Sequence, residues 1–256
     1  MAISIASVAT GPGGQTGSTV TVNKPTGGWV DGNRLFAFTA ADIPSSGTIG
    51  IPSAFTSFGA DSDGETLSGW RDCSSEPASY TFPMASGSAA ERAAIIIEVA
   101  GHDPAIDPIH STPKPGNSKT ASFNSLTTTV DGSLILAFVG DSYRASSTTF
   151  GTPTGFNPEA TDQSGVVSNF STAAEAFSLI QTSKGAITVG KSAITNSATA
   201  ANNFWGTIAI GIAPATGGGG TVVFRRTLSR LGTRGGSRQT FQTRKGLLVP
   251  VYGMAA

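Results

Sequence analysis

The sequence has little charge, one cysteine and two histidines. Asp, Glu, Lys and Arg make up 12% of the 256 residues, about half the share of an average soluble domain. The single cysteine, Cys73, excludes an intrachain disulfide and a cysteine-rich metal site, so burial must stabilise the fold. The sequence also lacks the roughly 18 consecutive apolar residues of a transmembrane helix and the basic and apolar regions of a secretion signal. We therefore expect neither a membrane span nor a leader.

Helical periodicity is nearly absent, whereas Thr, Val, Ile and Phe, which suit a half-buried sheet, are common. Residues 171–177 contain good helix formers, but they alternate and run directly into Leu179 and Ile180, so we predict a strand there. Turn residues separate the apolar runs at the spacing of an antiparallel sandwich. The predicted fold is all-β and jelly-roll-like, with strands at 3–8, 19–22, 34–38, 55–58, 80–82, 93–100, 121–126, 134–138, 174–181, 186–189 and 206–213.

The body of the chain repeats itself weakly. A shift of 100 residues superposes 30–38 on 130–138, and in both segments a Val-Asp-Gly sequence leads into an apolar run. Asp31 and Asp131 are accordingly predicted to be turn residues. Segments 51–55 and 152–156 share a Pro and a Phe, and 94–100 is similar to 206–213. We expect two pseudo-repeated halves around one shared core, because each half supplies only about five strands and the linker at 113–117 is short.

Charge divides the chain in two. Residues 1–214 hold all sixteen acidic and nine basic residues, a net charge of −7, whereas the remainder has no acidic residue and a charge of +7. We expect a sandwich body at 1–214, a glycine-rich linker at 215–220 and a basic assembly arm at 221–256. The predicted partner-binding residues are the seven cations of the arm: Arg225, Arg226, Arg230, Arg234, Arg238, Arg244 and Lys245.

Four arginines of the arm recur every fourth residue, as they would along a helix, but Gly232, Gly235 and Gly236 would each cost a helix roughly 1 kcal/mol. We therefore predict an extended arm that orders against a partner, where its guanidiniums bind carboxylates or phosphates. The apolar segment 246–252 could add a strand to a neighbouring sheet. The alternatives to a partner-binding arm are a tail that keeps the protein soluble and a tail that folds back on the body of its own chain. Nucleic acid is disfavoured as a partner because aromatic residues are few and the acidic body would repel phosphate.

Few residues form patterns that suggest chemistry. His102 and His110, with Asp103 and Asp107, could form a metal site or an acid and base pair, but the two Asp-Pro sequences favour a turn-rich crossover. Cys73 is predicted to be a buried small hydrophobe. We expect no catalytic residue, no metal and no cofactor, and hence no enzyme.

Two weaker patterns remain. The acidic segment 61–65 resembles part of a calcium loop but lacks its other ligands, which favours a plain acidic turn; Glu65 and Glu76 as a glycosidase pair have no further support. Trp29, Trp70 and Trp205 could stack on sugars, although their positions in the sequence favour packing. A carbohydrate- or receptor-binding adhesin module is therefore the alternative function, with a cell-surface glycan as its partner.

The order of these segments resembles a known family. Segments 22–27 (VNKPTG), 30–32, 51–55, 75–82 (SEPASYTF) and 130–132 together resemble a sandwich domain of tailed-bacteriophage structural proteins, over about residues 5–214. The segment 224–239 is similar to the ends of some phage tail and virion proteins. The resemblance implies a non-enzymatic virion protein that decorates the capsid or belongs to the tail or baseplate. Its expected partners are other virion proteins and copies of itself, as a homo-oligomer.

Overall fold

The computed structural model describes residues 2–12, 16–17, 19–42, 49–63, 65–83, 90–143, 147–164, 171–197, 203–215, 240–244 and 247–251. Within these ranges every regular element is a β-strand and every strand pairing is antiparallel, which confirms the all-β prediction. The same residues include no helix that could cross a membrane. The chain divides into two compact units, Met1–Ala215 and Thr216–Ala256. We call the first unit the body.

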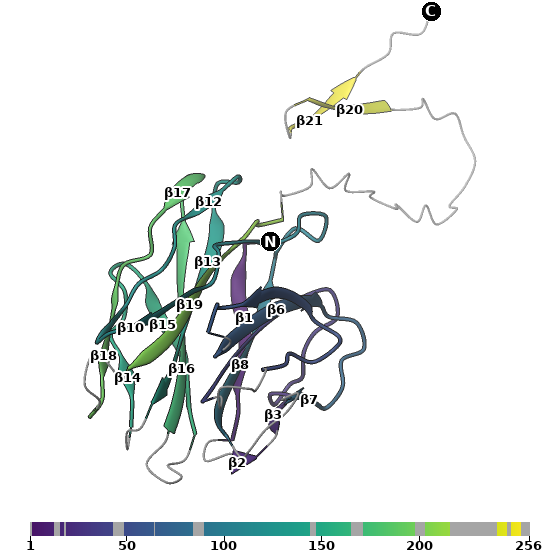
Figure 1. Ribbon diagram of the computed structural model, residues 1–256. Helices are drawn as coiled ribbons and strands as arrows, with labels where there is room; N and C mark the ends of the chain where they lie inside the picture. Colours follow the sequence, from purple (N-terminus) through teal and green to yellow (C-terminus); the bar gives the residue numbers. More distant parts are fainter. Residues whose placement is uncertain are drawn as a thin grey trace, which may run out of the picture. The chain divides into compact units, whose positions relative to one another are not determined.

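Two six-stranded sheets form the centre of the body (Figure 1). In order across the first sheet lie β1 (Ser4–Thr10), β8 (Ala90–Ala100), β4 (Arg34–Ala41), β6 (Thr66–Asp72) and β5 (Thr56–Ala60), with β2 (Thr16–Gly17) beside β8. In order across the second lie β10 (Lys114–Asn117), β19 (Phe204–Ile212), β13 (Ser133–Tyr143), β16 (Ser171–Gln181) and β15 (Asn157–Gln163), with β9 (Ile109–His110) beside β19.

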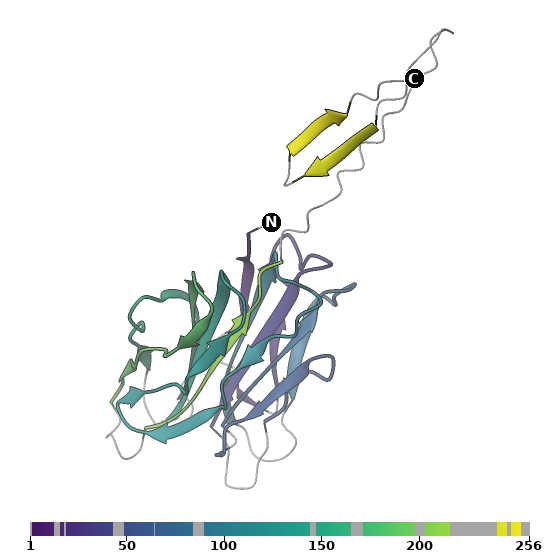
Figure 2. The same ribbon diagram turned by 90° about the horizontal axis from the view of Figure 1, so that it is seen from above.

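Three small sheets complete the body. They are β3 (Thr19–Asn23) with β7 (Ser79–Pro83), then β11 (Thr120–Ala121) with β18 (Ser192–Thr195) and β14 (Thr149–Phe150), and finally β12 (Leu126–Thr128) with β17 (Gly185–Ile187). Figure 2 shows the strands of residues 1–100, in purple to blue, beside those of the second sheet, in teal to green.

Both faces of each central sheet are buried. Alternate side chains of a strand point to opposite faces, and all eight residues of β4 are buried. Phe38 packs between the sheets, where its ring stacks on that of Phe138 with centroids 5.1 Å apart. Leu35, on the other face, packs with Val22 and Phe82 of the small sheet β3–β7. The second sheet is likewise covered on its outer face. The two halves therefore share the core between the sheets, as predicted, and each half has a further core on the outer face of its own sheet.

The two central sheets have the same strand order, with β1, β8, β4, β6 and β5 in the places of β10, β19, β13, β16 and β15. Each carries an Asp-Gly turn before its middle strand, in which Gly32 and Gly132 have positive φ values of 88° and 73°. Asp31 Oδ1 accepts a hydrogen bond from the backbone N of Ser75, and Asp131 Oδ1 accepts one from that of Lys184. Both aspartates are thus turn residues, as predicted. The jelly-roll form and the repeat remain predictions.

Some strands differ from expectation. Residues 171–177 belong to β16, as predicted, but β6 and β15 were not expected, and 122–125 are not in a strand. The expected linker at 113–117 is wrong as well, because Lys114–Asn117 forms strand β10. Pro115 lacks a backbone donor, and it is tolerated there because β10 pairs with β19 alone, at the edge of the sheet.

The unit Thr216–Ala256 contains one hairpin among its described residues. Its strands are β20 (Thr240–Arg244) and β21 (Leu247–Val251), and Arg244 pairs with Leu247 next to the turn. Within this unit the backbone of 247–251 therefore pairs with β20. The addition of this segment to a neighbouring sheet stays a prediction.

Candidate functional site

The connection from β8 to β9, residues 101–108, joins the two sheets and lies against the end of the body. We call it the crossover. Gly101 O accepts a hydrogen bond from Ala215 N at 2.7 Å, and Asp103 N donates one to Ala213 O at 2.9 Å. Gly101 has a φ of +72°, and a Cβ there would lie 2.4 Å from Ala2 O. Only glycine fits this position. The hydrogen bond from Ala215 to Gly101 also shows that the last residue of the body lies beside the crossover.

Arg34 anchors the crossover from the start of β4. Its side chain is 1% exposed, and its Nε lies 2.6 Å from Asp72 Oδ1. Nη1 donates to Ile106 O at 2.8 Å, and the guanidinium stacks over the Trp70 ring, 4.3 Å from the centroid. The planar guanidinium thus holds a strand end, an aromatic ring and the crossover together. Its role is structural.

His102 lies beside Asp72 rather than beside the aspartates of its own segment. The residue is buried, and its Nε2 is 3.4 Å from Asp72 Oδ1. Burial, followed by the nearby charge of Arg34, lowers the pKa of the imidazole below its usual range. Asp103 Oδ1 instead accepts a hydrogen bond from Ala105 N, the local turn role that was predicted. The structure therefore does not join His102 and Asp103 as an acid and base pair.

His110 is also separate from the aspartates of the crossover. It lies on β9, where its ring centroid is 4.7 Å from that of Phe58 and its Nδ1 is 3.0 Å from Ser111 O. Asp107 is exposed. In the described part of the chain, no group of three or more His, Cys, Asp or Glu residues could hold a metal ion.

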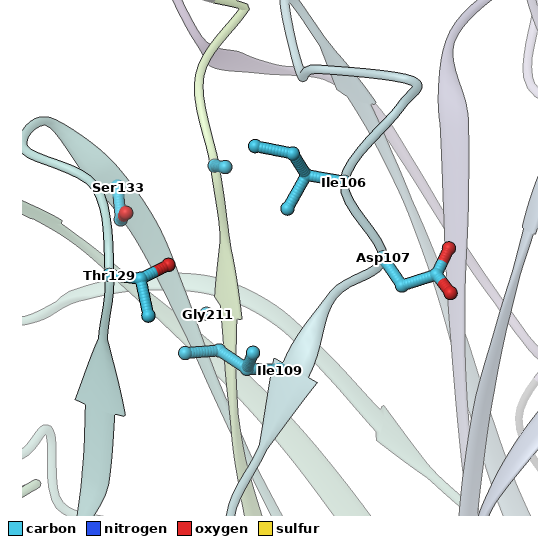
Figure 3. A pocket seen from close by; sticks show the side chains of 7 residues that line it. Ile106, Asp107, Ile109, Thr129, Ser133 and Gly211 are labelled. Carbon is cyan, nitrogen blue, oxygen red and sulfur yellow. The ribbon is translucent and has the colours of Figure 1, made fainter.

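A small hollow lies between the crossover, β12, β13 and β19 (Figure 3). Its lining residues are Ile106, Asp107, Ile109, Thr129, Ser133, Gly211 and Ala213. Ile106 and Ile109 point toward the strand that carries Gly211, whereas the carboxylate of Asp107 points away. The volume of the hollow is about 10 Å³, roughly the space of one water molecule and far below the 300 Å³ or so at which small-molecule sites begin.

The opposite end of the body carries buried carboxyl groups. Asp61 is 5% exposed and accepts hydrogen bonds from Glu65 N at 3.0 Å and Thr66 Oγ1 at 2.6 Å. Its carboxylate therefore stabilises its own turn, which agrees with the prediction of a plain acidic turn. Glu65 accepts a hydrogen bond from Ser142 Oγ across the two sheets, and burial raises its pKa to about 7.

Three further carboxyl groups at this end have raised pKa values because they are buried. The pKa rises to about 6 for Asp141 and Asp162 and to about 7 for Glu175. Asp162 Oδ2 accepts a hydrogen bond from Ala94 N and thereby links β15 to β8 of the first sheet. Asp141 accepts from Thr148 and Asn196. Sequence reasoning did not find these groups.

The remaining candidates serve packing. Trp29 and Trp205 are each 5% exposed and Trp70 lies under Arg34, so the three rings offer no open platform for a sugar. Cys73 is buried as predicted, and burial raises the pKa of its thiol to about 12.

Glu65 and Glu76, the candidate glycosidase pair, lie at opposite ends of β6: Glu65 precedes its start and Glu76 follows its end. Glu76 pairs with Arg71 and accepts a hydrogen bond from Tyr80. Seven extended residues span about 20 Å, too far for a glycosidase pair.

The predicted partner-binding residues of the arm are almost all outside the described residues. These are Arg225, Arg226, Arg230, Arg234, Arg238 and Lys245; Arg244 lies at the end of β20. Their role stays a prediction. No family model matches the chain, and no similar protein was found among curated proteins or solved structures.

Proposed function

We propose that this chain is a non-enzymatic structural component of a bacteriophage particle that docks to neighbouring subunits through its basic C-terminal arm. One observation carries the proposal: the boundary in charge coincides with the boundary between the structural units. The body, Met1–Ala215, holds sixteen acidic and nine basic residues, and Thr216–Ala256 holds seven basic and no acidic ones. Opposite net charges on two units of a chain favour association between copies.

The places of the candidate catalytic groups support a structural role. Arg34 and Asp72 anchor the crossover, and Asp61 and Asp103 accept hydrogen bonds within their own turns. Each of these four side chains is thus used by the fold. The assignment to a phage particle follows the resemblance of residues 5–214 and 224–239 to virion proteins.

Deletion of the arm tests the proposal. A chain ending at Ala215 keeps the three cores, so we expect a folded body that is absent from purified particles of the phage that carries the gene. Mass spectrometry of the particles measures its copy number. A second variant, with the six arginines of the arm replaced by lysine, keeps the charge of +7 and tests whether bidentate guanidinium contacts are needed. Incorporation of the truncated body at the wild-type copy number would falsify the proposal.

A further inference from the structure

Exposed negative charge collects at the crossover end of the body. Among the described residues the exposed carboxylates are Asp31, Asp63, Asp72, Asp107 and Asp131. Asp31 and Asp131 occupy the turns before β4 and β13, and Asp72 and Asp107 lie at the end of β6 and in the crossover. Asp63, between β5 and β6, is at the opposite end. Four of the five exposed carboxylates thus share one end.

Most of this charge is not neutralised within the body. Asp72 is paired with Arg34, so we leave it out and define the acidic rim as Asp31, Asp103, Asp107 and Asp131. No ion pair within the described ranges involves a residue of the rim. At the opposite end, by contrast, five carboxyl groups are nearly enclosed: Asp61, Glu91, Asp141, Asp162 and Glu175. Apart from Asp63 and the paired Asp72, the exposed carboxylates of the described residues therefore belong to the rim.

Apolar surface lies at the same end. Val30, next to Asp31, is 54% exposed, and Ile180, near the end of β16, is 45% exposed. The hollow between Ile106, Ile109 and Gly211 opens beside Asp107. An apolar centre with a polar margin is the usual composition of a protein docking surface. In the sequence of the arm, Arg244 and Lys245 come just before Leu247 and Leu248, which matches this combination of charge and apolar surface.

We propose that the acidic rim, together with the exposed apolar side chains of Val30 and Ile180 at the same end, is the receptor for the basic arm of a second copy of this chain. This inference rests on the function proposed above. The body and the arm have formal net charges of opposite sign, −7 and +7, which favours binding of an arm to a body. Ala215 lies beside Gly101, so the arm departs from the end that carries the rim. Two copies that meet at these ends can exchange arms in a closed, twofold arrangement.

Self-association of the full chain tests the receptor. The variant Asp31→Asn/Asp107→Asn/Asp131→Asn removes three charges, and the Asn side chains at 31 and 131 keep the Oδ1 atoms that accept from Ser75 N and Lys184 N. We expect the wild type to form dimers in low salt by light scattering and sedimentation. The triple variant should have a dimer dissociation constant at least about tenfold higher. Asp63→Asn, an exposed charge at the opposite end, is the control and should dimerise like the wild type.

A mixing experiment separates the two proposals. The body ending at Ala215 has a rim but no arm and should be monomeric. The triple variant has an arm but an altered rim and should dimerise at least about tenfold more weakly than the wild type. Their mixture should form a 1:1 complex, because the arm of the variant can bind the rim of the truncated body. Dimerisation of the truncated body as strong as that of the wild type would overturn the role of the arm. If only the arm is needed and the triple variant dimerises normally, the receptor assignment alone is wrong. A monomeric wild type, with its arm crosslinked to its own rim, would overturn the choice of a second copy.

Discussion

The packing of the two central sheets makes a sharp prediction at Gly140. This residue of β13 faces Ala40 of β4, and an added Cβ would lie 2.6 Å from the Cβ of Ala40 and 3.0 Å from Thr66 Cγ2. Carbon atoms in contact prefer roughly 3.5–4.0 Å, so Gly140→Ala requires the sheets to move apart locally by about 1 Å. Overpacking of this kind costs about 1–3 kcal/mol, and the smaller entropy loss of Ala offsets up to about 1 kcal/mol. We expect a net destabilisation of about 1–2 kcal/mol.

The double variant Ala40→Gly/Gly140→Ala is the matched control, because it moves one methyl group from the first sheet to the second. We expect it to recover a large part of the loss, with a coupling free energy of about 1 kcal/mol. Urea unfolding followed by tryptophan fluorescence measures Gly140→Ala, Ala40→Gly and the double variant, since Trp29, Trp70 and Trp205 belong to the body. A Gly140→Ala chain with the wild-type urea midpoint, or strictly additive effects, would refute the packing of β4 against β13.

Two further predictions concern charge. The raised pKa values of Glu65, Asp162 and Glu175 mean that the folded body keeps protons that the unfolded chain releases between about pH 4 and 7. The stabilisation from these retained protons is fully present below the pKa values of the unfolded chain. It is lost as the pH rises through the pKa values of the folded body. The urea midpoint should therefore be higher at pH 5 than at pH 8, and less pH-dependent in Glu65→Gln; a midpoint that rises with pH contradicts this. Arg34→Met should cost about 2–4 kcal/mol in urea unfolding, because the hydrogen bond to Ile106 O and the pair with Asp72 are lost; a change below about 0.5 kcal/mol would exclude the anchoring role.

Local chemistry made several elements predictable. The Asp-Gly turns at Asp31 and Asp131 follow from the positive φ that glycine tolerates, and β-branched runs favour strands. Strand β15 was missed because Asn157–Gln163 is polar and contains Pro158, and such a strand is stable only through its pairing with β16. The buried carboxyl of Asp162 could not be predicted either, since its donor, Ala94 N, is 68 residues away.

The sequence alone determined the strand-rich class, the turn chemistry and the separation of charge between body and tail, because these depend on residue types and their spacing. Only the tertiary structure decided that the outer face of each sheet has a core of its own, that Asp72 meets Arg34 and His102, and that four of the five exposed aspartates among the described residues share one end of the body. The physical reason is the range of the interactions. Propensity and net charge are properties of a segment, whereas burial, pairing and exposure depend on which distant segments become neighbours.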